Sequence, residues 1–424
     1  MKILVQNVTI ESPGSSFHGK ICDLLMEDGI ILRVEPGNSI QEKNIKIFSG
    51  NSLCVSPGWF DLRVNFREPG MELKEDLLSG MQAAQQGGFT GVLCMPSTTP
   101  PVHSKSEIDF IRNKSKDQLV DVIPAGALSH NLEGKDLSEM YDMHRSGAMA
   151  FTDDKLAIQD SGFMIRALRY VSDFGGRIMV HPEDKMVAGK GQVNESLAAT
   201  GLGLQGIPAL AEELMIRRDL SIAEYTGSAI HFSAISTAGS VDLIRKAKAT
   251  GLKVTCDVSS AHLYLDDSSL SSFDSHFKIQ PPLRSKPDVE ALIRGLSDGT
   301  IDCIASDHEP QDAESKLMEF EHAAYGISSL ETSFAVSRTA TKNALSVSVL
   351  VEKLAINPRK FLGLEIPEIK SGVYANLTLF DPDAEWIPDP SRWFSKSKAN
   401  PFFGKKLTGK AIAVFNRNKV YECI

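Results

Sequence analysis

The sequence predicts an α/β protein: a (β/α)8 barrel of the TIM type, joined to a small β-sandwich that is built from both ends of the chain. Three observations lead to this prediction. Strand-like segments alternate with amphipathic helical patterns between residues 56 and 365, which is typical of parallel strands with helical crossovers. The segments before and after this region have the pattern of strands alone. Polar residues that can bind metals or take part in catalysis follow several of the predicted barrel strands, and such barrels place their active sites at these strand ends.

The two chain ends are predicted to form one accessory domain, with residues 1–55 and 366–424 in the β-sandwich and residues 56–365 in the barrel. At the N-terminal end, "KILVQNVTI" has the pattern of a strand, and "ICDLLMEDGIILRVEPG" that of a hairpin about residues 27–29. At the C-terminal end, "YANLTLFD" and "AIAVFNRNKVYEC" have the pattern of strands, the second turning at residues 416–418. We therefore expect the ends to meet in one sheet.

Eight strands are expected in the barrel, separated by helical patterns. The predicted strands are residues 59–65, 90–96, 120–128, 148–152, 177–181, 228–233, 253–259 and 301–306. Helical patterns such as "IPALAEELMIRRDLSIAEYTG" and "TAGSVDLIRKAKATG" finish at glycine, which favours a helix C-terminus. A doubly wound open sheet is the alternative architecture, but no Gly-x-Gly-x-x-Gly follows the first strand.

The bulk composition limits the classes of function. The formal net charge of -9 over 424 residues, without a run of Lys or Arg, argues against a nucleic-acid partner. No apolar run approaches the roughly 20 residues that span a bilayer, and the N-terminus lacks the apolar stretch of a secretion signal. The six cysteines are scattered, as expected of buried thiols in a reducing compartment. We expect a cytoplasmic protein without a membrane partner.

The first barrel strand carries a row of polar side chains. In "PGWFDLRVNFREPG", residues 57–70, alternate positions of a strand point to one side. Asp61, Arg63, Asn65 and Arg67 would therefore share one face. A polar row on an otherwise apolar strand indicates a site.

Other strand ends carry further candidates. The fourth strand is followed by Asp153 and Asp154, the fifth by His181, the sixth contains His231 near its end, and the eighth is followed by Asp307. Taken alone, each has an ordinary structural explanation as a core histidine, a helix cap or a turn. Together, two histidines and two carboxylates that converge in a barrel mouth form a plausible divalent-metal set, and the mixed nitrogen and oxygen donors favour zinc.

The chain resembles the dihydroorotases of the bacterial type and, more widely, the cyclic amidohydrolases. The segments that carry the resemblance are "SPGWFDLRVNFREPG", "GGFTGVLCMPSTTPP", "GAMAFTDD", "VHPED", "HFSAIST", "VTCDVSSAHLYL", "FKIQPPLRS" and "DGTIDCIASDHEP". They follow the family order across nearly the whole chain. The resemblance implies a metal-dependent barrel of the amidohydrolase kind with a terminal β-sandwich. It also implies interconversion of carbamoyl aspartate and dihydroorotate in pyrimidine biosynthesis.

The resemblance carries over only part of the metal site. The first strand of the family supplies a His-x-His pair, and this chain has Arg63 and Asn65 at those positions. Four implied metal ligands are kept: Asp154 as the bridging carboxylate, His181 and His231 at the second metal, and Asp307 as ligand and general base. Asp307 is thus the implied catalytic residue.

The substrate-binding positions are altered as well. Arg67 keeps the place of the arginine that binds the substrate carboxylate. Three other implied substrate positions differ from the family pattern: Ser97 replaces an asparagine of Met-Pro-Asn-Thr, Gln280 an asparagine before Pro-Pro-Leu-Arg, and Gln311 the last histidine of Asp-His-Ala-Pro-His. Residues 306–316 correspond to a lid in the family, and their acidic side chains disfavour a carboxylate ligand.

These replacements have physical consequences. Arginine is always protonated, so Arg63 cannot be a metal ligand and would repel a cation beside it. We expect the first metal to be lost, and the Arg63 guanidinium to occupy its place and pair with Asp307 or Asp154. At most one zinc ion per chain is expected at the second position, and the alternative is none.

Three functions remain open from the sequence. The first is a dihydroorotase-like protein with impaired or lost catalysis, acting as a scaffold for aspartate transcarbamoylase, a partner that the resemblance implies. The second is an active cyclic amidohydrolase with one zinc ion. The third is a metal-free protein that binds a small carboxylate through Arg67. In each case the ligand would be a small cyclic amide or carboxylate, and we expect a homo-oligomer.

Overall fold

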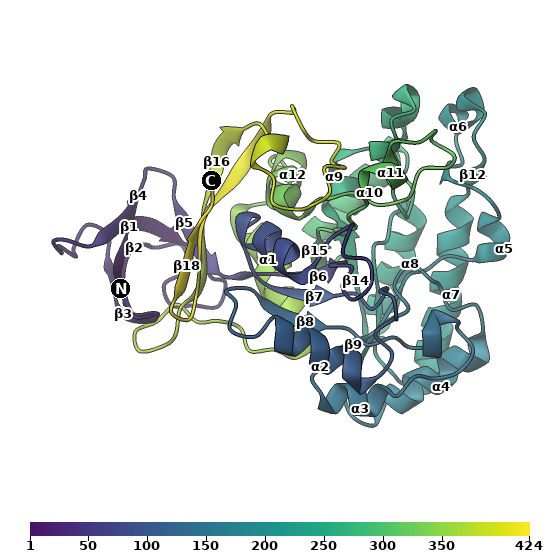
Figure 1. Cartoon of the computed structure of the whole chain (residues 1–424), viewed down its shortest axis with the longest axis horizontal. Helices are drawn as coiled ribbons and strands as arrows, with labels where there is room; N and C mark the ends of the chain where they lie inside the picture. The colour runs from purple at the N-terminus through teal and green to yellow at the C-terminus, as the bar shows by residue number, and fades with distance from the viewer.

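The computed structural model describes residues 1–424 and contains the predicted barrel and terminal sheet. Figure 1 shows two lobes, with both chain ends in the smaller lobe on the left. None of the helices combines the length and the apolar composition that crossing a membrane requires. The predicted fold class is confirmed.

The smaller lobe is one eight-stranded sheet made from both ends of the chain. Its main order is β18-β17-β16-β5-β1-β2-β3, and β4 also pairs with β1. The strands are β1 (Lys2–Ile10), β2 (Ile21–Glu27), β3 (Ile30–Pro36), β4 (Lys46–Ser49), β5 (Cys54–Pro57), β16 (Asn376–Trp386), β17 (Leu407–Asn416) and β18 (Lys419–Glu422). The N-terminal and C-terminal halves join where β5 pairs antiparallel with β16. A separate cluster of 17 buried residues forms the core of this lobe.

The two predicted hairpins are present in this sheet. Strands β2 and β3 pair with Glu27 opposite Ile30, and strands β17 and β18 pair with Asn416 opposite Lys419. Asp28 and Arg417 adopt positive φ in the two turns, a conformation that a two-residue hairpin loop favours. Strand β5 extends across residue 55, and the domain boundaries drawn from the sequence stay a prediction.

Eight parallel strands form the barrel. They are β6 (Trp59–Val64), β7 (Phe89–Cys94), β8 (Asp121–Pro124), β9 (Ala150–Phe151), β10 (Arg177–Val180), β13 (Ile230–Phe232), β14 (Val254–Ser259) and β15 (Cys303–Ala305). They pair as β6-β7-β8 and as β9-β10-β13-β14-β15. Single bridges close the ring, from Gly126 to Phe151 and from Val64 to His308. Each strand corresponds to a segment that the sequence predicts, and only β7 begins outside it, one residue earlier at Phe89.

Helices follow the strands and cover the barrel. The longer ones are α1 (Leu77–Gln86), α2 (Lys105–Lys114), α4 (Ser161–Ser172), α7 (Ala209–Thr226), α8 (Ala238–Ala249), α10 (Lys286–Ser297) and α12 (Ser333–Thr341). Shorter elements are α3 (Met140–Arg145), α5 (Lys185–Ala188), β11 (Val193–Asn194), α6 (Leu197–Leu202), β12 (Gly206–Ile207), α9 (Ser260–Tyr264), α11 (Ala313–Lys316), α13 (Val347–Val351) and α14 (Asn357–Leu362). As predicted, α7 ends at Gly227, which takes the left-handed conformation with φ +69°.

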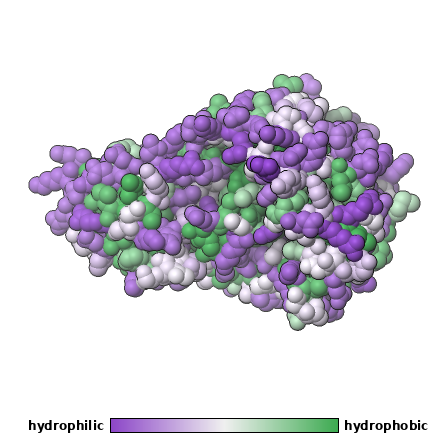
Figure 2. Space-filling model, turned by 90° about the horizontal axis from the view of Figure 1, so that it is seen from below, coloured by the Kyte–Doolittle hydropathy of each residue, from purple (hydrophilic) through white to green (hydrophobic).

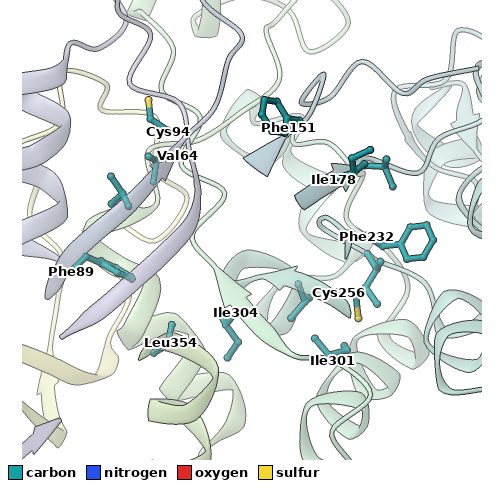
Figure 3. Packing of buried hydrophobic residues seen from close by; sticks show 14 of the residues in the cluster. Val64, Phe89, Cys94, Phe151, Ile178, Phe232, Cys256, Ile301, Ile304 and Leu354 are labelled. Atoms are coloured by element: carbon teal, nitrogen blue, oxygen red, sulfur yellow. The ribbon is translucent and has the colours of Figure 1, made fainter. Parts of the chain in front are cut away.

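The main core fills the space between the barrel strands and these helices. It is a cluster of 59 buried residues. Figure 3 shows residues of this cluster on several barrel strands, among them Phe151, Ile178, Phe232 and Ile304. The surface in Figure 2 is largely hydrophilic, with smaller hydrophobic areas between the polar side chains. The core holds the strands rigidly, so the residues at their ends have defined positions.

A C-terminal segment, residues 387–406, leaves the sheet after β16 and contacts the barrel before it returns in β17. Glu331 holds it, because Oε1 of Glu331 accepts the backbone N–H groups of Phe394 and Ser395, both at 3.0 Å. The segment also reaches the loop after β15, where Ser397 Oγ accepts the N–H of Gln311 at 3.2 Å. This segment therefore connects the sheet to the barrel mouth.

The buried Glu331 makes stability depend on pH. Burial raises its pKa from 4.5 to about 8, against the opposing backbone hydrogen bonds of Ser395 and Phe394. Between these two values the unfolded chain is ionised at this position and the folded chain is not, so stability decreases as the pH rises. We expect Glu331→Gln to match the wild type at pH 5 and to be more stable at pH 8.5 by on the order of 3 kcal/mol.

Urea denaturation at the two pH values measures this difference. The exposed Glu133 offers the control Glu133→Gln, which should follow the wild type at both. If Glu331→Gln also followed the wild type at both pH values, the carboxyl would not titrate as described.

Candidate functional site

Arg63 lies at the centre of the barrel mouth and joins two carboxylates. Its side chain is 1% exposed, and Nη2 donates to Asp154 Oδ1 at 2.9 Å. Its Nε lies 2.7 Å from Asp307 Oδ1, an ionic contact without the alignment of a hydrogen bond. The sequence predicted a pair with one of these aspartates, and the structure contains both. The guanidinium thus bridges Asp154, which follows β9, and Asp307, which follows β15.

Asp154 is further held by two neutral side chains. Asn65 Nδ2 donates to Asp154 Oδ2 and to Ser97 Oγ, each at 2.8 Å, and Ser97 Oγ donates to the same carboxylate oxygen at 2.5 Å. Both Asp154 oxygens therefore accept hydrogen bonds from the protein. Asn65 and Ser97, one predicted as a substituted metal position and the other as a substrate contact, both belong to this cluster.

A second cation, Lys155, lies against Asp307. Lys155 Nζ donates to Asp307 Oδ2 at 2.8 Å and also to the backbone carbonyl of Gln280. Burial by itself would raise the pKa of Asp307, but the charges of Lys155 and Arg63 lower it well below the ordinary value. Asp307 is therefore an ionised carboxylate between two cations. Sequence reasoning missed Lys155, although it directly follows the Asp-Asp pair.

The two predicted histidine ligands have different surroundings. His181 is buried, and neither ring nitrogen has a hydrogen-bond partner in the protein. Burial, and then the charges of Lys155 and Arg63, lower the pKa of His181 well below 6.5, so its imidazole is neutral. His231 is fully buried, and both of its nitrogens are engaged by polar side chains: Nδ1 lies 2.8 Å from Thr255 Oγ1 and Nε2 lies 2.9 Å from Asp257 Oδ2.

These contacts do not fit a zinc ion. A zinc site needs three or four deprotonated donors that converge on one point. Here the guanidinium of Arg63 lies between Asp154 and Asp307, and His231 is bonded on both sides by protein groups. No three His, Cys, Asp or Glu side chains lie together as a metal-binding group would. The assignment of Asp154, His181, His231 and Asp307 as metal ligands stays a prediction.

The implied substrate contacts are occupied by the protein itself. Arg67 Nη2 lies 3.2 Å from Glu309 Oε1. Gln311 accepts a hydrogen bond from Lys74 Nζ at 2.7 Å and donates to the carbonyl of Tyr325 at 2.6 Å. The Gln280 side chain donates to the carboxylate of Glu183 at 3.2 Å. The roles of Arg67, Ser97, Gln280 and Gln311 in substrate binding stay predictions.

Several buried polar atoms at the strand ends keep free hydrogen-bonding capacity. They belong to residues at the ends of β6, β10, β13 and β14: Asn65 Oδ1, both nitrogens of His181, Ser233 Oγ and Ser260 Oγ. Buried polar atoms rarely stay without partners in proteins. Their concentration at one end of the barrel indicates a polar interior that can bind a small polar molecule or water.

Known proteins of similar sequence match nearly the whole chain. A family model described as "Dihydro-orotase-like" matches residues 53–240. The dihydroorotase of Syntrophus aciditrophicus (strain SB) is 39% identical over 422 residues, which cover 99% of each chain. The dihydroorotase of Acetivibrio thermocellus is 40% identical over 410 residues, covering 96% of each chain. The chain belongs to the dihydroorotase family.

Solved structures confirm the fold of this family member. An L-hydantoinase (dihydropyrimidinase) from Arthrobacter aurescens is 25% identical, with a TM-score of 0.85, and the match covers 99% of this chain and 95% of the other. A D-hydantoinase (dihydropyrimidinase) from Thermus sp. has a TM-score of 0.81 at 22% identity, covering 99% and 94%. The resemblance to dihydroorotases that the sequence motifs indicated is confirmed by the relatives at 39% and 40% identity.

Proposed function

We propose that this dihydroorotase-family protein acts in cytoplasmic pyrimidine biosynthesis as a structural partner of aspartate transcarbamoylase and has lost turnover of dihydroorotate. The observation that carries the proposal is the position of Arg63, which pairs with both Asp154 and Asp307. A fixed cation at this point satisfies the two carboxylates and competes with a divalent ion for them. Asp307 is moreover a poor proton acceptor, since Lys155 and Arg63 lower its pKa.

The second candidate is an active cyclic amidohydrolase that interconverts carbamoyl aspartate and dihydroorotate with one zinc ion. The relatives that favour it are named dihydroorotase and match over nearly the full chain. Within the site, His181 favours it, because its neutral imidazole has both nitrogens free for a ligand bond. This candidate requires His231 to exchange its bond with Asp257 for a bond to the metal.

Dihydroorotate hydrolysis by the purified, zinc-supplemented protein distinguishes the two candidates. We expect no turnover above that of Asp307→Asn, purified in the same way to expose contamination by the host enzyme. Turnover well above this control would establish the zinc-dependent enzyme and overturn the loss of catalysis.

The partner role is tested separately, by size-exclusion chromatography with light scattering on a mixture with the transcarbamoylase of the same organism. We expect a stable complex of equal yield with the wild type and with Asp307→Asn, because a structural role does not need that carboxylate. Separate elution of the two proteins would exclude the scaffold.

A further inference from the structure

The guanidinium of Arg67 is engaged by the chain's own loop. Arg67 follows β6, its side chain is 6% exposed, and its backbone has φ +61°. Nη2 lies 3.2 Å from Glu309 Oε1, and Nε donates to the backbone carbonyl of Pro310 at 3.3 Å. Both acceptors belong to the loop after β15, here defined as residues 306–312. The loop thus places a carboxylate on a buried arginine that has no other acidic partner.

This contact is weaker than the one a free carboxylate could form. Charge-assisted hydrogen bonds to carboxylates are usually about 2.7–2.9 Å long, and an arginine binds a carboxylate best through two parallel bonds. Glu309 offers one oxygen to one nitrogen, at 3.2 Å. The covalent tether of Glu309 gives it a high local concentration, which compensates for its poor geometry.

The loop is held against the neighbouring segment, residues 325–327. The N–H of Glu309 donates to the carbonyl of Ile327 at 2.8 Å. Gly326, at φ +109°, packs so closely that a Cβ there would lie 2.5 Å from the Glu309 carbonyl oxygen. Gln311 donates to the Tyr325 carbonyl at 2.6 Å. These contacts fix Glu309 opposite Arg67.

Glu309 occupies the Arg67 nitrogen that a ligand carboxylate would need. A carboxylate binds a guanidinium through two parallel bonds either at Nε and Nη2 or at Nη1 and Nη2, and Nη2 is the atom that contacts Glu309. A ligand carboxylate that binds Arg67 in this way therefore has to displace Glu309. Because Glu309 is 13% exposed and its side chain has no other hydrogen bond, outward movement breaks one ionic contact.

We propose that Glu309 is a built-in competitor for Arg67, and that a small carboxylate binds at the barrel mouth by displacing it. Carboxylates of this class would then open the loop, and the loop would close again when they leave. The proposal goes beyond the structural role proposed above. It needs neither a metal nor the transcarbamoylase, so complex formation and turnover can fail without affecting it.

Isothermal titration of the full-length protein with dihydroorotate tests the competition. We expect Glu309→Gln, which removes the charge and keeps the shape, to bind at least about tenfold more tightly than the wild type. The matched control is Glu314→Gln in the same loop region, because Glu314 is exposed and has no ionic partner; it should bind like the wild type. Adding Arg67→Gln to Glu309→Gln should remove the binding.

Hydrogen exchange of the unliganded proteins gives a second readout. The amides of residues 307–312 should exchange faster in Glu309→Gln than in the wild type or in Glu314→Gln, since the loop has lost its ionic contact. Equal affinities of the wild type and Glu309→Gln, or no binding to either, would overturn the proposal. Tighter binding that survives Arg67→Gln would overturn it too, because the carboxylate would then lie elsewhere. Thermal melting verifies that each variant is folded.

Discussion

Replacement of Arg63 by leucine is expected to lower the free energy of unfolding by about 3–5 kcal/mol, the usual cost of removing one partner from a buried ion pair. Arg63 is 1% exposed, and Asp154 and Asp307 are 4% and 7% exposed. Without the guanidinium, Asp154 keeps only neutral donors, and Asp307 keeps Lys155 alone. Asp154 would then be a buried carboxylate without a cationic partner.

Guanidinium chloride denaturation at pH 7 measures this loss. The control is Arg33→Leu, because Arg33 is 45% exposed and pairs with Glu35 and Glu42 at the surface; exposed pairs of this kind contribute about 0–1 kcal/mol. The deficit of Arg63→Leu should shrink as the pH is lowered from 7 to 5. In the variant the pKa of Asp307 is higher than in the wild type, because one of the two cations that lower it is gone, and protonation of Asp307 then relieves part of the loss. A loss no larger than that of Arg33→Leu would show that the ion pairs do not hold the mouth together.

A double variant with histidines at both altered strand positions, Arg63→His with Asn65→His, is expected to gain a zinc site. The wild type should retain little zinc after dialysis, because Arg63 places a positive charge between the carboxylates of Asp154 and Asp307. The double variant removes that charge and adds two imidazoles beside the same carboxylates, a donor set that zinc accepts, at about one ion per chain. Metal analysis by mass spectrometry counts the bound zinc.

The control for the zinc site is Arg63→Leu with Asn65→Leu, which removes the same charge without adding a ligand. It should stay free of zinc and be the less stable protein. Zinc should also raise the melting temperature of the histidine variant alone, since a ligand that binds only the folded state stabilises it. Stoichiometric zinc in the wild type, or none in the histidine variant, would contradict the view that Arg63 replaces a metal.

The fold and the location of the site were predictable from the sequence. Hydrophobic periodicity and helix-ending glycines are local signals, so all eight barrel strands correspond to predicted segments, with β7 beginning one residue early. The carboxyl ends of barrel strands meet at one mouth, which places Arg63, Asp154, His181 and Asp307 in one region without knowledge of any contact. That Arg63 cannot be a metal ligand follows from the chemistry of the guanidinium alone.

The pairing of these side chains was decided only by the tertiary structure. Arg63 bridges residues 91 and 244 positions away in the chain, and sequence reasoning had left open which of the two it would meet. The bonds from His231 to Asp257 and Thr255, the contact of Lys155 with Asp307, and the contact of Glu309 with Arg67 had no local signal. Such contacts depend on the orientation of side chains from distant strands, which core packing sets and which no pattern along the chain records.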